Sequence, residues 1–352
     1  MSYLCRCFSH GKMARIQDYD SIYSFFKHLV DWVFVHSYRR IQYVGKENIP
    51  ADGAVIYAPN HTNALQDALA ILTINPGHKV FVARADIFKK NKRLTWLLHG
   101  LKIMPVNRMR DGVDELKHND ETLENAVNTL ADGVPFCILP EGTHRPKHSL
   151  LPLGKGIFRI ALRANEKFGQ ERNIYIVPVG LEYGDYFHLW DSLTVNIGAP
   201  INVTQRVREF RSQQLTEPQM MLHLRDELTQ RMREQILWVP DDENYEKNIE
   251  KLIDNPPAPF NKFKKHKIPK WLLLTALVVL SPLFLVCAVI TAPLWIIWLF
   301  IQHTIADPAF HNSVQWLVQF VLIPLSLFIT LPFWIFFQEY MYQLRKLKKS
   351  KI

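Results

Sequence analysis

The sequence predicts an α/β domain with a largely covered sheet, followed by a C-terminal transmembrane helical hairpin. Short β-rich runs alternate with helical segments over residues 41–240, and this alternation is typical of a sheet covered by helices. Two runs without a charged residue follow, at 271–301 and 313–338, and a bilayer span needs roughly 20 apolar residues. The 352 residues of the chain are enough to bury a sizeable core in the domain before them.

The β-rich runs predict six strands, at 54–59, 79–84, 101–106, 135–140, 174–183 and 193–198. Pro178 lies inside the fifth run, and because proline cannot donate to a ladder we expect that strand at an edge or a bulge. Helical spacing predicts helices at 113–130, 156–168 and 215–238.

Residues 21–40 have aromatic and aliphatic residues at helical spacing and are expected to form an amphipathic helix on the membrane face of the domain. Its apolar side would carry Phe25, Phe26, Trp32 and Phe34. A helix buried in the core is the alternative. The expected parts of the chain are an N-terminal extension (1–20), this helix (21–40), the α/β domain (41–240), a proline-rich basic linker (241–270), two transmembrane helices (271–301 and 313–338) and a basic tail (339–352).

The net charge of +9 is concentrated near the apolar runs. Residues 261–352 contain ten Lys or Arg against Asp307 and Glu339, which leaves +1 for everything before them. Basic residues in that position favour the surface of an anionic leaflet, at about 1 kcal/mol each. We therefore expect membrane lipids as partners and no nucleic acid.

The same charges predict the topology. Both basic clusters should face the cytoplasm, so the apolar region crosses an even number of times and the domain lies on the cytoplasmic face of an integral membrane protein. The connection around Asp307 would then lie on the far side of the membrane. The first run is long for one span, and Pro282 and Pro293 would kink it, so a re-entrant turn is the alternative.

The four cysteines are dispersed. Cys137 and Cys287 lie in apolar runs and are expected in the core, which fits a reducing cytoplasm. Cys5 and Cys7 have no second pair of ligands, so no metal site is expected there. No signal peptide is expected, because no suitable apolar run follows Met1.

His61 and Asp67 are the first candidates for chemistry. His61 follows the strand at 54–59, and Asn63 and Gln66 fit a capping box at the start of the next helix. Helical side chains tilt toward the N-terminus, so Asp67 is able to lean back toward His61. A carboxylate on one imidazole nitrogen would leave the other free to take a proton from a hydroxyl. The alternative is that His61 is an ordinary loop residue with no catalytic role.

A second group of candidates follows two other strands. Arg108 ends the strand at 101–106, and its guanidinium suits a phosphate, although a solvated loop charge is the alternative. The strand at 135–140 leads into Glu141, Gly142 and Thr143, where the Gly142 amide would face a substrate. Arg145 and Lys155 add positive charge nearby. The alternative reading is an ion-paired Glu141 beside a turn.

Together these blocks resemble the glycerolipid (PlsC-type) acyltransferase superfamily over about residues 40–200. The blocks are Asn-His…Asp at 60–67, a strand ending in Arg108, Pro-Glu-Gly-Thr at 140–143 and Val-Pro-Val at 177–179. The resemblance implies a mixed sheet with covering helices. By family analogy His61 is the general base, Asp67 orients it, Arg108 and Arg145 hold phosphate, and Glu141 and Gly142 shape the acceptor site.

Two departures from the family pattern concern the first and third blocks. Five residues separate His61 from Asp67 where the family has four, so Gln66 occupies the usual Asp place. His144 intervenes where the family reads Glu-Gly-Thr-Arg. Both differences resemble the branch that contains fungal-type glycerol-3-phosphate and dihydroxyacetone-phosphate acyltransferases.

The resemblance implies transfer of an acyl group from acyl-CoA or acyl carrier protein to a glycerophosphate hydroxyl, in phospholipid biosynthesis. Neither a metal nor a bound cofactor is expected, since a thioester is already activated and the chain has no Zn²⁺ signature. The leading acceptor is 1-acylglycerol-3-phosphate. Glycerol-3-phosphate, dihydroxyacetone phosphate and a lyso-aminolipid are alternatives, and an inactive membrane scaffold is an alternative of a different class. The oligomeric state is not readable from the sequence.

Overall fold

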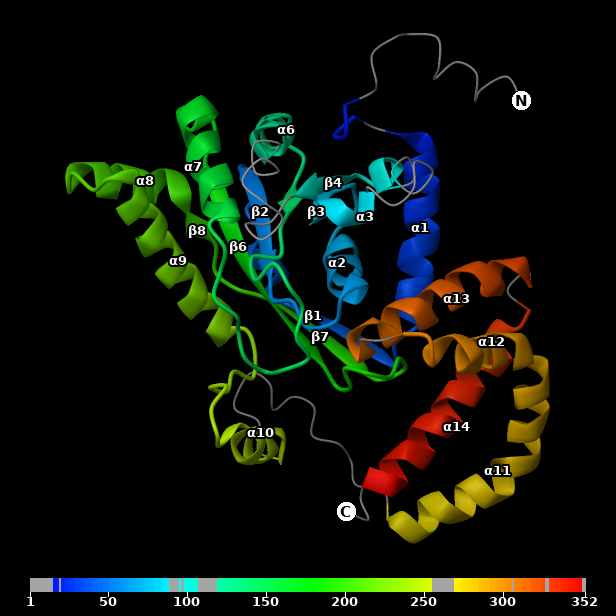
Figure 1. Ribbon diagram of the computed structural model, residues 1–352. Helices are drawn as coiled ribbons and strands as arrows, with labels where there is room; N and C mark the ends of the chain where they lie inside the picture. The colour runs from blue at the N-terminus through cyan, green and yellow to red at the C-terminus, as the bar shows by residue number, and fades with distance from the viewer. Residues whose placement is uncertain are drawn as a thin grey trace, which may run out of the picture.

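A mixed sheet covered on both faces by helices forms the body of the molecule (Figure 1). The computed structural model describes residues 15–18, 20–88, 95, 98–106, 119–254, 269–305, 307–326 and 329–349. The sheet order is β1-β7-β6-β2-β5-β3-β4, with β8 paired to β6. β1, β7 and β8 run opposite to the other five strands, so the mixed sheet is confirmed.

All six predicted strands are present. The strands are β1 (Arg40–Val44), β2 (Ala54–Pro59), β3 (Val80–Arg84), β4 (Ile103–Val106), β5 (Phe136–Cys137), β6 (Ile174–Tyr183), β7 (Ser192–Ile197) and β8 (Ile201–Asn202). β1 and β8 were not predicted. β1 lies at one edge, paired in parallel with β7 alone, and β8 contains two residues, so neither has the apolar run that marks a central strand.

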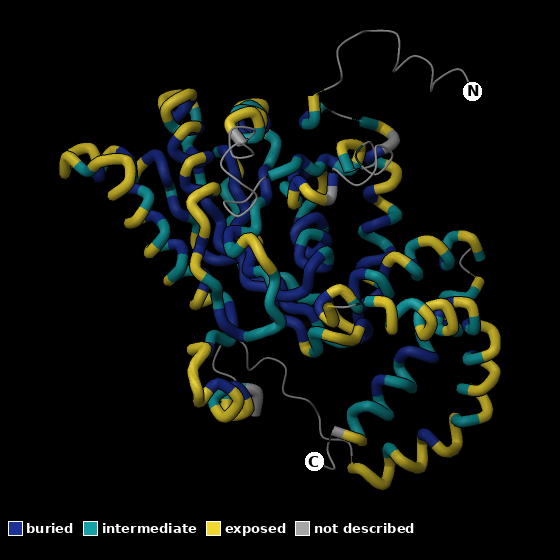
Figure 2. The backbone as a smooth tube through the Cα atoms, viewed as in Figure 1, coloured by how far each residue is buried: buried dark blue, intermediate teal, exposed yellow. Residues whose placement is uncertain are grey.

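Two hydrophobic cores lie on the two faces of the sheet (Figure 2). Alternation along β2 divides them: Ile56 points into one core and Tyr57 into the other, and both are fully buried. Burial of a large apolar side chain contributes about 1.5–3 kcal/mol. The first core is closed by α6 (Asn119–Ala131), α7 (Gly156–Phe168), α8 (Val203–Ser212) and α9 (Glu217–Glu234), and the second by α1 (Ser21–His36), α2 (Leu65–Leu72) and α13 (His311–Leu325). Short elements complete the domain: a 3₁₀ turn at Lys46–Asn48, α3 (Ala85–Phe88) and α10 (Tyr245–Asp254).

The expectation of an edge position for the strand that contains Pro178 is wrong. β6 lies inside the sheet, between β2 and β7. Pro178 is tolerated because it falls where the neighbour changes: β8 pairs up to Ile176, and β7 pairs from Val179 onward. The Pro178 carbonyl still accepts a hydrogen bond from the amide of Gly198, at 2.9 Å.

The helix expected on the membrane face is α1, and its apolar residues divide between two environments. Phe34 and Val33 are buried in the second core, so the expectation of an exposed Phe34 is wrong. Phe25 and Phe26 are 69% and 44% exposed. One side of α1 therefore packs against the sheet, and the first turns of the helix expose apolar side chains.

The C-terminal apolar runs form four helices rather than two. They are α11 (Lys270–Ile290), α12 (Ala292–Gln302), α13 and α14 (Leu331–Lys349). The first run breaks at Thr291, whose amide and hydroxyl both donate to the carbonyl of Cys287, and Pro293 follows at the start of α12. In the part of the chain that the structure describes, α11 alone is long and apolar enough to cross a membrane. A continuous helix over 271–301 is therefore wrong, and the run 313–338 is divided between α13 and α14.

The structure does not support a hairpin whose connection lies across the membrane from the domain. The carboxylate of Asp307 accepts from Nε2 of His144, at 2.8 Å, in the α/β domain. In α14, Glu339 accepts from Arg39 at 2.8 Å and from the Trp190 indole at 3.0 Å. The middle of the tail region, at Asp307, and its last helix, α14, thus both contact the domain, which agrees with the re-entrant alternative.

We expect position 304 to lie on the same side of a membrane as the α/β domain. In a chain without its native cysteines, Thr304→Cys and Lys251→Cys would place single thiols at exposed sites in the α12–α13 connection and in α10. A membrane-impermeant maleimide applied to intact and then permeabilised cells should label both in the same condition. Labelling of the two cysteines from opposite sides of the membrane would contradict this expectation and support the transmembrane hairpin.

Candidate active site

The candidate site lies where neighbouring parallel strands end. β2 leads into His61, β5 leads toward Glu141, and β6 ends at Tyr183. The side chain of Asn60 joins the first and third of these strands beyond their ladder: its Oδ1 accepts from the Leu181 amide at 2.7 Å, and its Nδ2 donates to the Leu181 carbonyl at 3.2 Å. In sheets of this kind, reactive groups collect at the carboxyl ends of the strands.

The carboxylate of Asp67 is fully buried and accepts four hydrogen bonds. Its Oδ2 accepts from Nδ1 of His61 and from the backbone amides of Thr62 and Asn63, each at 2.8 Å, and its Oδ1 accepts from the Tyr183 hydroxyl at 2.7 Å. Since a carboxylate only accepts, Nδ1 of His61 carries a proton and Nε2 is the basic nitrogen. The predicted contact between His61 and Asp67 is confirmed.

The predicted capping box at the start of α2 is wrong. The residue before the helix is Ala64, at φ +43°, and the Asn63 side chain makes no hydrogen bond to any residue that the structure describes. The Asn63 amide, which Gln66 would accept in a capping box, donates to the carboxylate of Asp67 instead. The Gln66 side chain turns away from this amide: its Oε1 accepts from the Tyr38 hydroxyl at 3.0 Å, and its Nε2 donates to the Asn312 carbonyl at 3.4 Å. Gln66 therefore joins α2 to α13.

Glu141 ties two loops together. Its two carboxylate oxygens accept from the backbone amides of His61 and Leu151, both at 2.8 Å. Burial raises the pKa of Glu141 to about 7, and the two amide bonds oppose that rise. Gly142 has φ +67°, which favours glycine, and its amide donates to the Leu139 carbonyl at 3.1 Å. The expectation of a Gly142 amide free to face a substrate is therefore wrong.

The predicted cations are not gathered into one cradle. Arg108 lies outside the described residues. The guanidinium of Arg145 is paired with Asp241 and donates to Ser149 Oγ at 2.7 Å, while Lys147 donates to the same Asp241 at 2.6 Å. Lys155 is exposed at the start of α7, and Thr143 is exposed beside Gly142. The Arg145 backbone lies close to the base, since its amide donates to the His61 carbonyl at 3.0 Å.

Sequence reasoning missed three residues at this site. Tyr183 ends the strand of the Val-Pro-Val block, but its position there carries no sign of a bond to Asp67. The ring of His144 stacks edge to face against His61, with centroids 5.4 Å apart. The third is Asp307, which had been expected across a membrane.

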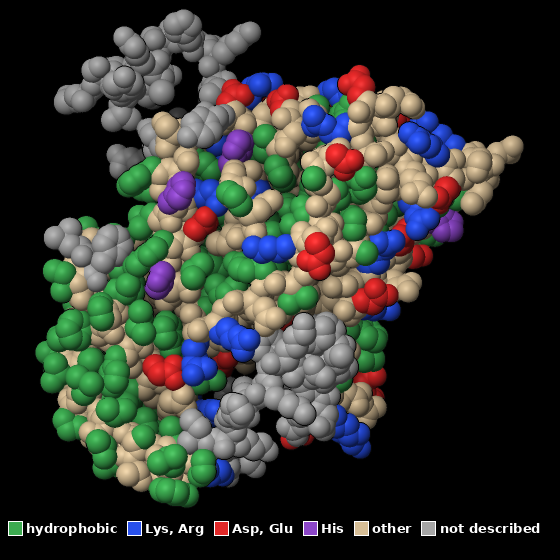
Figure 3. All heavy atoms as spheres, turned by 180° about the vertical axis from the view of Figure 1, so that it is seen from behind, with side chains coloured by type: hydrophobic (Ala, Val, Ile, Leu, Met, Phe, Trp, Pro, Cys, Tyr) green, Lys and Arg blue, Asp and Glu red, His purple; other side chains and the backbone are tan. Residues whose placement is uncertain are grey.

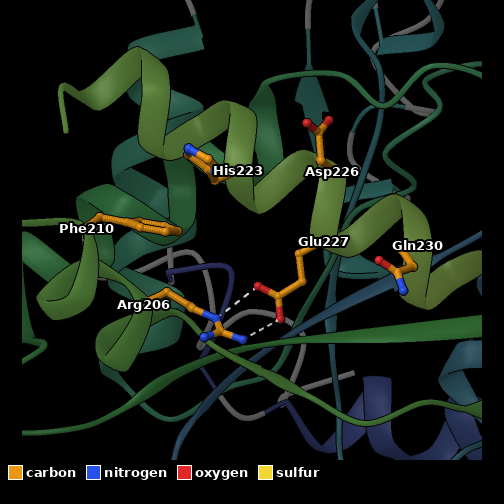
Figure 4. Close-up of a pocket in the computed structure, with 6 residues that line it drawn as sticks. All are labelled: Arg206, Phe210, His223, Asp226, Glu227 and Gln230. Carbon is orange, nitrogen blue, oxygen red and sulfur yellow. Dashed lines mark hydrogen bonds and ion pairs between the residues drawn. The ribbon is translucent and has the colours of Figure 1, made fainter. Parts of the chain in front are cut away.

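A separate hollow of about 340 Å³ lies between α8 and α9 (Figure 4). Arg206 points into it but is held by Glu227, with Nε–Oε2 and Nη2–Oε1 distances of 3.0 Å. Phe210 and His223 line the same hollow. None of these residues belongs to the His61 site.

Residues 40–182 match the model of the family described as Acyltransferase. This segment of the chain is similar to that family, as the His61–Asp67 and Glu141–Gly142–Thr143 blocks predicted.

Distant relatives carry more specific names. The chain is 25% identical over 150 residues to the proteins named 1-acyl-sn-glycerol-3-phosphate acyltransferase alpha of Ovis aries and Homo sapiens, which is 42% of this chain and 47% and 48% of theirs. It is 27% identical over 152 residues to the protein named 1-acyl-sn-glycerol-3-phosphate acyltransferase BAT2, chloroplastic, of Brassica napus, which is 42% of this chain and 39% of that one. The chain thus spans less than half the length of these curated relatives.

Among solved structures, the chain is similar to the crystal structure of the 1-acyl-sn-glycerophosphate (LPA) acyltransferase PlsC from Thermotoga maritima. The TM-score is 0.43 at 20% sequence identity, over 66% of this chain and 86% of that chain.

We expect the substitution Glu141→Gln to destabilise the protein at acid pH, and to do so less as the pH rises toward 7. The side-chain NH₂ of the glutamine would face one of the two backbone amides that now donate to Glu141. Two donors cannot pair, and an unpaired buried polar group costs about 1–3 kcal/mol. Because the folded-state pKa of Glu141 is raised to about 7, the folded protein holds this proton more tightly than the unfolded chain does. The stability of the wild type relative to the variant should therefore fall as pH rises from about 4.5 to about 7, by up to about 3 kcal/mol.

Thermal unfolding of both proteins in the same detergent, between pH 5 and 8, measures this difference. An equal offset in melting temperature at every pH would show that Glu141 titrates as it does in water.

Proposed function

We propose that the protein is an O-acyltransferase that moves a fatty acyl group from acyl-CoA or acyl carrier protein to a glycerophosphate hydroxyl. The leading acceptor is 1-acylglycerol-3-phosphate, whose product is phosphatidate. The observation that carries the proposal is the His61–Asp67 pair, in which Asp67 accepts four hydrogen bonds at the strand ends of a segment that matches the acyltransferase family model.

The proposed reaction needs one base and two positioned substrates. Nε2 of His61 takes the proton of the acceptor hydroxyl while Asp67 holds the opposite nitrogen. The acceptor oxygen attacks the thioester carbonyl, the tetrahedral intermediate collapses with loss of the thiolate, and the thiolate receives the proton from His61. General-base help of this kind contributes typically about 10²–10⁴-fold. Orientation of the two substrates supplies a further part of the rate.

The acceptor is proposed from two sources. The names of the similar sheep, human and rapeseed proteins favour 1-acylglycerol-3-phosphate. Arg108, Arg145 and Lys155 remain the proposed phosphate ligands, and their charge would suit any glycerophosphate. Arg145 would exchange Asp241 for the phosphate. Glycerol-3-phosphate and dihydroxyacetone phosphate fit the same charges, whereas a lyso-aminolipid fits them less well.

We also propose that the tail helices attach the domain to a membrane on its cytoplasmic face. The outer sides of α11, α12 and α13 expose a continuous apolar surface that includes Val278, Val289, Phe300 and Leu325 (Figure 3). An exposed apolar surface of this extent is typical of contact with lipid. Basic residues at the start of α11 and the end of α14 suit an anionic leaflet. An amphiphilic acceptor and the site would then meet at one interface.

The substitution His61→Ala should reduce acyl transfer to less than about 1% of wild type, because it removes the base. The protein should stay folded and membrane-bound, since the side chain lies at the edge of the core. The control is His28→Ala, an exposed histidine in α1.

Purified proteins would be assayed with labelled acyl-CoA and acyl carrier protein against the three phosphorylated acceptors and a lyso-aminolipid. If the turnover of His61→Ala is within tenfold of the wild-type value, the assignment of His61 as the base is wrong. A wild type that transfers to no acceptor would favour the inactive scaffold instead.

A further inference from the structure

A second histidine–carboxylate pair stands beside the first. His144 donates through Nε2 to Asp307 at 2.8 Å, and its ring lies 5.4 Å, centroid to centroid, from that of His61. On its other side the ring meets Phe310 edge to face, at 4.8 Å. His144 is largely buried, with 15% of its side chain exposed. The imidazole is thus held from both sides next to the proposed base.

The tail segment that supplies this carboxylate is firmly seated on the domain. Asp307 also accepts from the Ala309 amide at 3.0 Å, which fixes its own direction. Immediately after it, Asn312 Nδ2 donates to the Tyr186 carbonyl at 2.9 Å, and Ser313 Oγ accepts from the amide of Leu65 at 3.2 Å. Leu65 begins α2, the helix that carries Asp67. Residues 307–313 therefore contact both His144 and the first turn of the helix that carries Asp67.

His144 stands directly after Glu141-Gly142-Thr143, at the position where the family motif Glu-Gly-Thr-Arg has its arginine. In this chain the arginine, Arg145, comes one residue later. The Arg145 guanidinium bonds Asp241 and Ser149, whereas the His144 ring lies against that of His61. With Nε2 engaged by Asp307, Nδ1 is the ring nitrogen left for a ligand. No hydrogen bond to this nitrogen is found within the described residues.

We propose that His144 is a binding residue for the acceptor and that Asp307, from the C-terminal tail, is its positioning residue. This inference rests on the proposed function and makes it more specific. In the imidazolium form, whose Nε2–H is held by Asp307, Nδ1–H of His144 donates to a phosphate oxygen of the glycerophosphate headgroup, which places the reacting hydroxyl at Nε2 of His61. The tail region is then part of the active site in addition to its role as an anchor.

The test measures acceptor and donor separately in the full-length protein, with 1-acylglycerol-3-phosphate and acyl-CoA in mixed micelles. His144→Ala should raise the acceptor KM about tenfold or more, which corresponds to one hydrogen bond to a charged group. Its donor KM and kcat should change by less than about threefold. Asp307→Asn should also raise the acceptor KM, whereas Asp307→Glu, which keeps a carboxylate, should restore it to near the wild-type value. A purely structural role for Asp307 would not depend on whether the side chain carries a carboxylate.

The double variant His144→Ala/Asp307→Asn should be no worse than His144→Ala, since Asp307 acts through His144. The matched control is Glu243→Gln, an exposed acidic residue near α10 that should leave all constants unchanged. If His144→Ala does not fold, His144→Gln supplies the same comparison with a side chain of similar reach.

Equal changes in the acceptor and donor KM, or an acceptor KM that stays at the wild-type value in the His144 variants, would overturn the inference. The same holds if Asp307→Glu does not recover the acceptor KM. An active wild type with these results rejects only the role of His144. A wild type inactive on every acceptor rejects the proposed function itself.

Discussion

The carboxylate of Asp67 is the group on which the rest of the site depends. A buried charge is tolerated only when its hydrogen-bonding capacity is filled, and here four donors fill it. Two of them are backbone amides of the turn after β2, one is the imidazole of His61, and one is the hydroxyl at the end of β6. A single buried group therefore fixes the turn, the tautomer of the histidine, and the distance between a strand and the helix that follows it.

The other motif residues of the sequence act mainly on the backbone around this group. Glu141 accepts from the amide of His61 itself, and Asn60 prolongs the contact between β2 and β6. Arg145 adds a bond from its amide to the His61 carbonyl. The backbone of His61 is thus held on both sides, and its ring is held by Asp67. Preorganisation of this kind lets a base act without rearrangement of its surroundings during the reaction.

Local signals were enough for most of the domain and for the first pair of catalytic candidates. Each strand of the sheet centre has an apolar run of its own, and His61 and Asp67 are six residues apart where β2 leads into α2. The pairing of His144 with Asp307 joins residues 163 positions apart, and nothing in either neighbourhood predicts it.

The contacts between the tail helices and the domain could not be predicted from the sequence for a related reason. An uncharged run looks the same to a hydropathy scan whether it meets lipid or protein. In α13, Trp316 and Gln319 are buried against the domain, and Gln319 accepts a hydrogen bond from Ser37 at 2.9 Å. Pro178 shows the same limit inside the sheet, since the change of neighbour that tolerates it is a property of the assembled strands.

The coupling between His61 and Asp67 tests the account most directly. A double-mutant cycle would compare single-turnover rates of the wild type, His61→Ala, Asp67→Asn and the double variant, with the melting temperature of each recorded. If Asp67 acts by holding His61, Asp67→Asn should slow the wild type by about tenfold or more and change the His61→Ala protein by less than about threefold. Losses that multiply in the double variant would show that the two residues act independently, and would contradict the assignment of His61 as a base oriented by Asp67.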